Sequence, residues 1–564
     1  MEALDWLVIG VFFLALIGII VWVVRQKQND SADYFLGGRD ATWLAIGASI
    51  FASNIGSEHL IGLAGAGASS GMAMAHWEIQ GWMILILGWV FVPFYTRSMV
   101  YTMPEFLERR YNPQSRTILS VISLVSYVLT KVAVTVYAGG LVFQQVFGIK
   151  ELWGIDFFWI AAIGLVVLTA LYTIFGGMKS VLYTSVLQTP ILLLGSLIIL
   201  VLGFKELGGW DEMMRVCGAV TVNDYGDTMT NLIRSNDDAN FPWLGALIGS
   251  AIIGFWYWCT DQFIVQRVLS GKNEMEARRG TIFGAYLKLL PVFLFLIPGM
   301  IAFALHQKYI GAGGEGFLPM LANGTANADA AFPTLVAKLL PAGVKGLVVC
   351  GILAALMSSL ASLFNSSAML FTIDFYKRFK PETPEKKLVG IGQIATIVIV
   401  VLGILWIPIM RSVGDVLYTY LQDVQSVLAP GIAAAFLLGI CWKRTSAQGG
   451  MWGLISGMVI GLTRLGAKVY YSNAGEVADS TFKYLFYDMN WLFFCGWMFL
   501  FCIIVVIVVS LATEAPTAEK IQGLVFGTAT KEQKAATRAS WNHWDIIHTV
   551  IILAITTAFY WYFW

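Results

Sequence analysis

The sequence predicts an all-α membrane protein with fourteen transmembrane helices, ten of which form a five-plus-five inverted-repeat core. Three observations support this fold class: the apolar composition, the regular series of apolar spans and the distribution of basic residues among the connections. Of the 564 residues, 58% are hydrophobic and only 13% are charged, and the mean hydropathy is +0.72. A soluble chain of this length cannot carry that much apolar surface, so we expect a polytopic membrane protein.

Fourteen apolar spans follow one another along the chain, and most contain the about 20 residues that a helix needs to cross a bilayer. A few are longer, as expected for helices that tilt or extend past the bilayer. The first span is too long for a signal peptide and has no basic residues before it, so we expect it to be retained. The spans lie near 4–24, 42–66, 73–96, 117–147, 152–175, 181–203, 243–268, 281–305, 342–376, 388–407, 412–441, 447–470, 489–512 and 546–564.

The distribution of basic residues predicts the orientation of these helices. Lys and Arg are concentrated in every second connection, namely 25–41, 97–116, the turn at Lys179, 267–280, 377–387, 443–444 and 513–545. Since basic connections stay on the cytoplasmic side, this pattern places both termini outside a plasma (inner) membrane. A missed or false span would have disturbed the alternation, so the pattern also supports the count of fourteen.

The connection 204–242 divides the spans into two groups of five, 42–203 and 243–441. Because each group has an odd number of spans, the second group is inverted relative to the first. The other spans are an extra N-terminal helix at 1–24, two peripheral helices in 442–512 and a C-terminal helix at 546–564, which follows a cytoplasmic loop at 513–545. Each group of five opens with an irregular span, and such a pair indicates a transporter with a binding site near the midplane.

The first irregular span contains Ala52-Ser53-Asn54-Ile55-Gly56-Ser57-Glu58-His59 in the middle of an apolar segment. Unpaired polar groups in lipid are costly, so a break of this kind is tolerated only where it lines a cavity. The unwound backbone then leaves carbonyl oxygens free to bind a cation. The second irregular span runs from Gly254 to Gln262. The sequence therefore predicts a transport site at the interruption.

Three serines, Ser358, Ser359 and Ser362, lie in a later span among small residues. Two adjacent hydroxyls are suitable ligands for sodium, a hard cation that prefers neutral oxygen atoms. The same composition is also typical of close helix packing, and both interpretations stay open at this point.

Two opposite charges, Glu78 and Lys288, lie within apolar spans of different halves and are expected to pair. Such a pair either locks two helices together or provides hydrogen-bonding groups for a hydroxylated solute. Gln422 and His59 add further polar groups of this kind. Trp77, Tyr257, Trp258 and Tyr418 could provide an aromatic face for a sugar, although aromatic residues are so abundant here that any one of them also suits packing or the membrane interface.

Two other charged residues are interpreted as structural. Lys131 lies within a span and has no evident partner in the sequence. Asp261 lies one and a half helical turns from Arg267, and we expect a local salt bridge between them near the inner surface.

Several segments together resemble the sodium/glucose cotransporter family of the sodium:solute symporters, from about residue 5 to the end of the chain. The matching segments are Ala52-Ser53-Asn54-Ile55-Gly56-Ser57 with His59, Phe255-Trp256-Tyr257-Trp258-Cys259-Thr260-Asp261-Gln262, Gly284-Ala285-Tyr286-Leu287-Lys288-Leu289, Ser358-Ser359-Leu360-Ala361-Ser362 and Ala429-Pro430-Gly431. The resemblance also implies the fourteen-helix, five-plus-five transporter fold.

The resemblance implies a sodium site and a sugar site. Sodium would be bound by the carbonyls of Ala52, Ile55 and Ala355 and by the hydroxyls of Ser358 and Ser359. The sugar-binding residues would be Asn54, His59, Glu78, Lys288 and Gln422, with Tyr257 closing the pocket from the inside and Trp258 beside it. The outer hydrophobic gate would be formed by Leu63, Trp77 and Tyr418.

Two positions depart from the family pattern. Many relatives have an Asp where this chain has Ser185, which argues against a second sodium ion and leaves the ratio of one or two per sugar open. Gly254 stands where relatives have Asn or Thr, so either one sugar hydroxyl loses its partner or a bulkier substrate fits.

The resemblance implies sodium-coupled symport of a monosaccharide of the glucose or galactose type, by alternating access across the lipid bilayer. The alternatives are another polyol such as inositol, an acid such as sialic acid, or a sugar sensor without coupled flux. Glu78 argues against anionic substrates. The net charge of +1 argues against a nucleic-acid partner, and no catalytic motif lies in a context that suits an enzyme.

Overall fold

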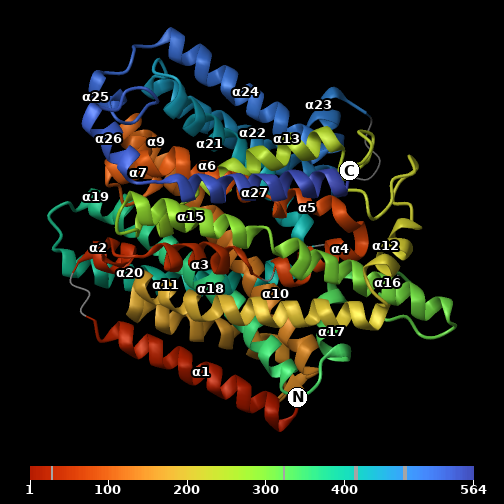
Figure 1. Ribbon diagram of the computed structural model, residues 1–564. Coiled ribbons are helices and arrows are strands. Elements are labelled where there is room, and N and C mark those ends of the chain that lie inside the picture. Colours follow the sequence, from red (N-terminus) through yellow and green to blue (C-terminus); the bar gives the residue numbers. More distant parts are fainter. Residues whose placement is uncertain (27–29, 57, 322–323, 412–416, 474–478) are drawn as a thin grey trace.

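The computed structural model describes residues 1–564 except 27–29, 57, 322–323, 412–416 and 474–478. The side chains at 129–130, 145, 409–411, 417–421 and 473 also lie outside the described part. The described chain is mostly helical (Figure 1). The two strands in this part of the chain, β1 (Glu151–Leu152) and β2 (Ile155–Asp156), form one short antiparallel pair in which Glu151 lies opposite Asp156.

The described part of residues 1–218 contains twelve α-helices: α1 (Ala3–Val24), α2 (Ser31–Leu36), α3 (Trp43–Asn54), α4 (Ala64–Ser70), α5 (Ala75–Glu78), α6 (Gly81–Ile86), α7 (Val92–Ser98), α8 (Met103–Arg110), α9 (Pro113–Ser126), α10 (Ala133–Phe147), α11 (Phe157–Leu207) and α12 (Trp210–Gly218). Short 3-10 or π-helical segments extend or join them: η1 (Gly37–Arg39), η2 (Glu58–Leu63), η3 (Gly71–Met74), η4 (Leu87–Phe91) and η5 (Tyr127–Val132).

The rest of the described chain contains α13 (Trp243–Gly254), α14 (Gln262–Leu269), α15 (Glu274–Lys288), α16 (Ile297–Gly311), α17 (Ala331–Leu339), α18 (Val344–Met369), α19 (Lys377–Phe379), α20 (Glu385–Arg411), α21 (Leu417–Cys441), α22 (Ala447–Asn473), α23 (Thr481–Lys483), α24 (Trp491–Ala512), α25 (Ala518–Ile521), α26 (Lys531–Ala539) and α27 (His543–Tyr562). The corresponding short segments are η6 (Phe255–Thr260), η7 (Val292–Leu296), η8 (Ala328–Ala330), η9 (Leu370–Tyr376) and η10 (Tyr484–Asp488).

The chain is a multi-pass membrane protein. Within the described residues, ten helical segments are long and apolar enough to cross a bilayer: Ala3–Val24, Glu58–Ser98, Phe157–Leu207, Trp243–Thr260, Glu274–Gly311, Val344–Phe379, Glu385–Pro408, Gln422–Cys441, Trp491–Ala512 and His543–Tyr562. The fourteen spans expected from the sequence remain a prediction. One reason for the difference is α11, which includes two expected spans, 152–175 and 181–203, and turns at Gly177, where φ is 52°.

Both irregular spans are broken helices, as the sequence predicts. Helix α3 ends at Asn54, and Ile55 is extended, with φ −81° and ψ 107°. The helix resumes as the π-helical η2. In the other half, α13 passes into the π-helical η6, and the extended residue Asp261 separates η6 from α14. Such departures from α-helical geometry are common at functional sites.

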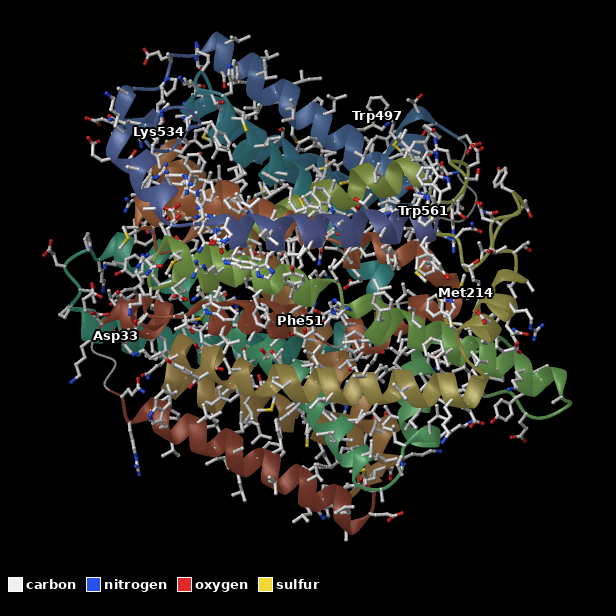
Figure 2. The ribbon with its side chains drawn as sticks, in the orientation of Figure 1. Asp33, Phe51, Met214, Trp497, Lys534 and Trp561 are labelled. Carbon is white, nitrogen blue, oxygen red and sulfur yellow. The ribbon has the colours of Figure 1, made fainter. Side chains whose placement is uncertain are left out.

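Short helices between the long ones gather at two opposite ends of the molecule. Figure 1 shows α2, α19, α25 and α26 toward the left end of the molecule, and α12, α23 and the C-terminus toward the right end. The first group belongs to the basic connections, and Figure 2 shows Lys534 at the same end. The region 513–545 is attached to the bundle there, because Arg97 donates to Thr537 Oγ1 and Arg278 donates to Ser540 Oγ.

Large apolar side chains cover the outside of the bundle. Trp497 on α24 is 62% exposed and Trp561 on α27 is 80% exposed, and Figure 2 shows Trp497 near the upper edge of the molecule. Surfaces of this kind suit contact with lipid rather than water. The polar residues that matter for a site therefore lie inside the bundle.

Candidate functional site

A cavity lies between the two broken helices. Its wall includes residues of α3, η2, α5, η5, α10, α13, η6, α14, α15, α18 and α21, so both halves of the chain contribute to it. The residues that line it are Asn54, Glu58, His59, Trp77, Glu78, Gln80, Lys131, Val134, Thr135, Ile253, Gly254, Tyr257, Trp258, Phe263, Lys288, Ser359, Leu363, Gln422 and Gln425.

A buried polar network joins the two halves across this cavity. Lys288, the last residue of α15, places its Nζ 2.6 Å from Glu78 Oε2 and 3.1 Å from Asn54 Oδ1. His59 Nε2 lies 3.4 Å from the same Glu78 oxygen. Glu78 is 1% exposed and Lys288 is 3% exposed, so neither charge is shared with bulk water. The expected pairing of Glu78 with Lys288 is confirmed.

Aromatic residues of η6 extend the network. Asn54 Nδ2 donates to Tyr257 Oη at 3.1 Å, which connects the break after α3 to the break after η6. The Lys288 Nζ lies 5.4 Å from the centre of the Trp258 ring, over its face. Asn54 is thus held by a phenol on one side and by an ammonium group on the other. Its amide therefore links the two halves of the chain.

The space beside Gly254 is filled by another side chain. The amide of Gln80 lies where a side chain at position 254 would project, and Trp258 Nε1 donates to its Oε1 at 3.2 Å. Of the two expectations for Gly254, room for a bulkier substrate is therefore wrong, because Gln80 occupies that room.

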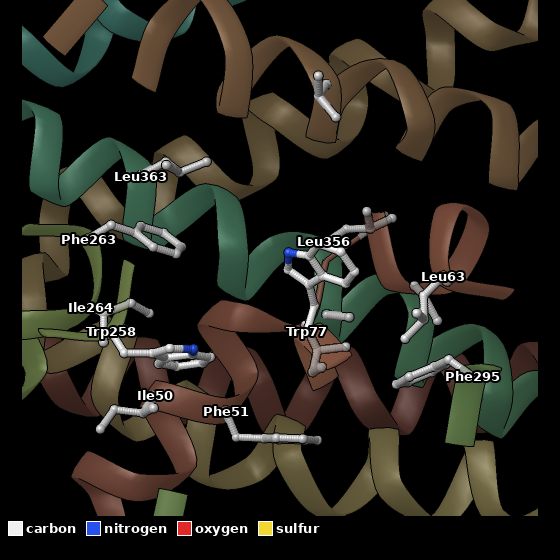
Figure 3. Packing of buried hydrophobic residues seen from close by; sticks show 14 of the residues in the cluster. Ile50, Phe51, Leu63, Trp77, Trp258, Phe263, Ile264, Phe295, Leu356 and Leu363 are labelled. Atoms are coloured by element: carbon white, nitrogen blue, oxygen red, sulfur yellow. The ribbon is translucent and has the colours of Figure 1, made fainter. Parts of the chain in front are cut away.

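The residues expected at the outer gate are only partly described. Leu63 is fully buried and Trp77 is 4% exposed. Figure 3 shows Trp77 between Trp258, which lies on the side of Phe263 and Ile264, and the pair Leu63 and Phe295 on the other side. The Trp77 ring also stacks on Trp491 of α24, with 5.5 Å between ring centres. The Tyr418 side chain lies outside the described residues. Gln422 lines the cavity and is 7% exposed.

The residues expected to bind sodium lie where the break meets α18. Ser359 Oγ donates to the carbonyl oxygens of Ser53, at 2.9 Å, and Ile55, at 3.1 Å. Ser358 Oγ instead lies 3.3 Å from Ser185 Oγ. Ala52 and Ala355 are 1% exposed, and Ala52 is in the last turn of α3, where helix carbonyls lack partners within the helix. The structure thus brings Ile55 and Ser359 together directly.

The partner of Asp261 is Lys131 and not the expected Arg267. Lys131 Nζ lies 2.6 Å from Asp261 Oδ2, and Tyr127 Oη donates to the other carboxylate oxygen. The expected partner of Asp261, Arg267, donates through Nε to Ser53 Oγ at 3.2 Å instead. The prediction was wrong because Asp261 is extended and begins a new helix, so a helical spacing between 261 and 267 does not apply.

Some cavity residues were not predicted, among them Glu58, Gln80, Thr135 and Gln425. Glu58 lies in the first irregular segment and Gln80 two residues after Glu78, so proximity to a predicted residue was the available signal. Thr135 and Gln425 lie inside ordinary apolar helices. Nothing in their local sequence distinguishes them.

Comparison with known proteins places this chain among membrane transporters. The model of the sodium:solute symporter family matches residues 34–457. The mouse protein named sodium/myo-inositol cotransporter 2 is 37% identical over 542 residues, which cover 94% of this chain and 80% of the mouse protein. The zebrafish sodium/glucose cotransporter 4 is 36% identical over 537 residues, covering 92% of this chain and 80% of the relative.

A solved structure shares the fold. It is a substrate-bound, outward-open sodium-coupled sialic acid symporter, with a TM-score of 0.72 and 22% sequence identity. The match covers 92% of this chain and 99% of the other.

Proposed function

This chain belongs to the sodium:solute symporter family, and from that membership we propose that it carries a neutral, ring-shaped polyol, a hexose or an inositol, into the cell together with sodium. It is a sodium-coupled transporter of a small solute, as the other members are. The proposal concerns the substrate class, the residues that bind it and the direction of movement.

The ion pairs of the cavity argue against an anionic substrate. Its lining residues include two carboxylates, Glu58 and Glu78, and two lysines, Lys131 and Lys288. Glu78 alone does not exclude an anion, because Lys288 pairs with it at 2.6 Å and offsets its negative charge. Lys288 is paired with Glu78 and Lys131 with Asp261, so neither lysine has a charge left to attract an anion.

The polar groups of the cavity suit a ring that carries several hydroxyls. We propose that Asn54, His59, Glu78, Lys288 and Gln422 exchange hydrogen bonds with these hydroxyls, because a hydroxyl both donates and accepts. We assign to Trp258 the apolar face against which the ring packs, and to Tyr257 the inner closure of the cavity. The observation that carries the proposal is the network in which Lys288 joins Glu78 to Asn54.

We propose that sodium binds at the break after α3, between the carbonyls of Ala52, Ile55 and Ala355 and the hydroxyls of Ser358 and Ser359. The contact of Ser359 with Ile55 supports this, because the cation would bridge the same two elements. An ion bound there fixes the break on which Asn54 also lies. Sodium binding would thereby order one wall of the polyol site.

Alternating access then moves both solutes inward. We propose that Leu63, Trp77 and Tyr418 close the outer side, that the two groups of five helices form an inverted repeat, and that both termini lie outside the plasma membrane. One charge moving through a membrane potential gains about 2.3 kcal/mol per 100 mV, which sustains roughly fifty-fold accumulation from the potential alone.

Competition for uptake tests the substrate class. Purified protein in liposomes with an inward sodium gradient would be offered labelled glucose and labelled myo-inositol, each with unlabelled galactose, sialic acid or mannitol as competitor. We expect uptake of at least one neutral ring polyol, competition by other ring polyols and none by sialic acid. Competition by sialic acid, or uptake of neither labelled solute, would contradict the proposal.

A further inference from the structure

Gln80 occupies a space that only glycine at position 254 leaves open. A Cβ built on Gly254 would lie 2.5 Å from Gln80 Oε1, 2.8 Å from Cδ and 2.9 Å from Nε2. These distances are shorter than van der Waals contact, so any side chain at 254 would displace the amide. Gln80 is 3% exposed, and both residues line the cavity.

Two partners with fixed roles orient the Gln80 amide. Trp258 Nε1, which only donates, bonds to Oε1 at 3.2 Å, and the main-chain oxygen of Ser250, which only accepts, takes a hydrogen bond from Nε2 at 2.8 Å. Turning the amide over would break both bonds. Among the described residues, the amide keeps one N–H and one acceptor position unused, and these are the two groups that a hydroxyl needs.

Gln80 also lies close to the charged network. Trp258 bonds to Gln80 through the edge of its ring, and the face of the same ring meets the Lys288 ammonium group at 5.4 Å. A ring-shaped solute in contact with Trp258 would therefore reach both the Gln80 amide and the Glu78–Lys288 pair. This places the amide within the binding wall rather than behind it.

We infer that Gln80 is a specificity-determining residue that binds one hydroxyl of the transported polyol, and that Gly254 is required because it leaves room for this amide. The inference rests on the proposed function, since it assigns a residue of the same cavity. It identifies a selective contact that neither the sequence motifs nor the family resemblance singled out.

A double-mutant cycle tests the link between the two positions. Gln80→Met keeps the length of the side chain but cannot form these hydrogen bonds, and Gly254→Ala displaces the amide while Gln80 is still present. We expect each variant to raise the KM for the preferred polyol about tenfold, the loss that one hydrogen bond in a binding site causes. The double variant should be no worse than either single one, because both act through one amide.

Gly164→Ala in α11 is the matched control, because nothing lies within 4 Å of the added Cβ. It should leave KM unchanged. The sodium concentration for half-maximal uptake should also stay at its wild-type value in Gln80→Met and Gly254→Ala, which separates a substrate contact from general damage to the fold.

Analogues of glucose and myo-inositol that each lack one hydroxyl identify the contact. We expect one analogue for which the wild-type protein and Gln80→Met have equal KM, because that analogue lacks the hydroxyl that Gln80 binds. Equal loss for every analogue, additive effects in the cycle, or a wild-type KM in Gln80→Met would overturn the inference while leaving polyol transport intact. If Gln80→Met does not reach the membrane, Gly254→Ala with the same analogues decides. A wild-type protein that transports neither polyol would overturn the proposed function and the role of Gln80 with it.

Discussion

The hydroxyl of Ser359 donates to the main-chain oxygen of Ile55 at 3.1 Å, and this bond joins the middle of α18 to the break after α3. Both residues are almost fully buried. The unwound backbone therefore meets a hydroxyl from the other half of the chain. The affinity for a cation bound between these elements would therefore depend on residues of both.

Ser359→Ala should weaken sodium activation without loss of folded protein. The variant removes one oxygen ligand of the proposed site, so the sodium concentration for half-maximal uptake should rise roughly tenfold. Ser367→Ala on the same helix is the control, because the Ser367 hydroxyl is buried and has no hydrogen-bond partner in the described residues. Sodium titration of uptake checks this, and an unchanged sodium dependence in Ser359→Ala would remove the assignment.

Lys288→Met should lower both stability and polyol affinity, because it leaves Glu78 buried without its ammonium partner. Removing one member of a buried ion pair costs about 3–5 kcal/mol, whereas replacing both members with neutral groups costs much less. Glu78→Gln combined with Lys288→Met should therefore recover the thermal unfolding midpoint but not the KM. A double variant as unstable as Lys288→Met would show that the pair is not what holds these two helices.

Two glycines of α16 should respond differently to alanine. A Cβ at Gly299 would lie 1.9 Å from the main-chain oxygen of Ala64, whereas nothing lies within 4 Å of one at Gly311. Overpacking of this kind costs about 1–3 kcal/mol, and rigid backbone on both sides favours the upper end. Thermal unfolding in detergent should show a lower midpoint for Gly299→Ala alone. Equal midpoints would mean that α4 and α16 are packed less closely.

One positive charge should enter with each polyol. Ser185 supplies only a hydroxyl, which donates to the main-chain oxygen of Val181 at 2.6 Å and lies 3.3 Å from Ser358 Oγ. Ser185 therefore offers a second sodium ion one hydroxyl that is already used in these contacts, in place of the carboxylate that the resemblance implies. Current and labelled uptake measured on the same proteoliposomes give the ratio. A value near two would show that hydroxyls alone suffice for a second ion.

The sequence predicted the broken helices and the charged pair correctly because both carry strong local signals. Gly56 and the polar residues around it have no place in an apolar helix, and an isolated Glu78 in a span requires a partner of opposite charge. Lys288 was the available cation in the other half. These expectations depended on the type of residue and on its position within an apolar span, and both can be read directly from the sequence.

Contacts that depend on the path of the backbone could not be predicted in the same way. Asp261 was paired with Arg267 by helical spacing, but its extended backbone turns the carboxylate toward Lys131. The Gln80 amide beside Gly254 is a similar case. A glycine in the sequence leaves space beside its backbone, but the sequence does not show which other side chain fills that space. Both outcomes were decided by tertiary packing between the two halves.

Solute accumulation in liposomes under different cation gradients tests the central claim most directly. Purified protein would receive labelled myo-inositol or glucose with an inward gradient of sodium, potassium or choline, and with the membrane potential set to the same inside-negative value. We predict accumulation above equilibrium in sodium and only slow equilibration in the other two media. Equal accumulation in all three would contradict a transport cycle driven by a cation at the break after α3.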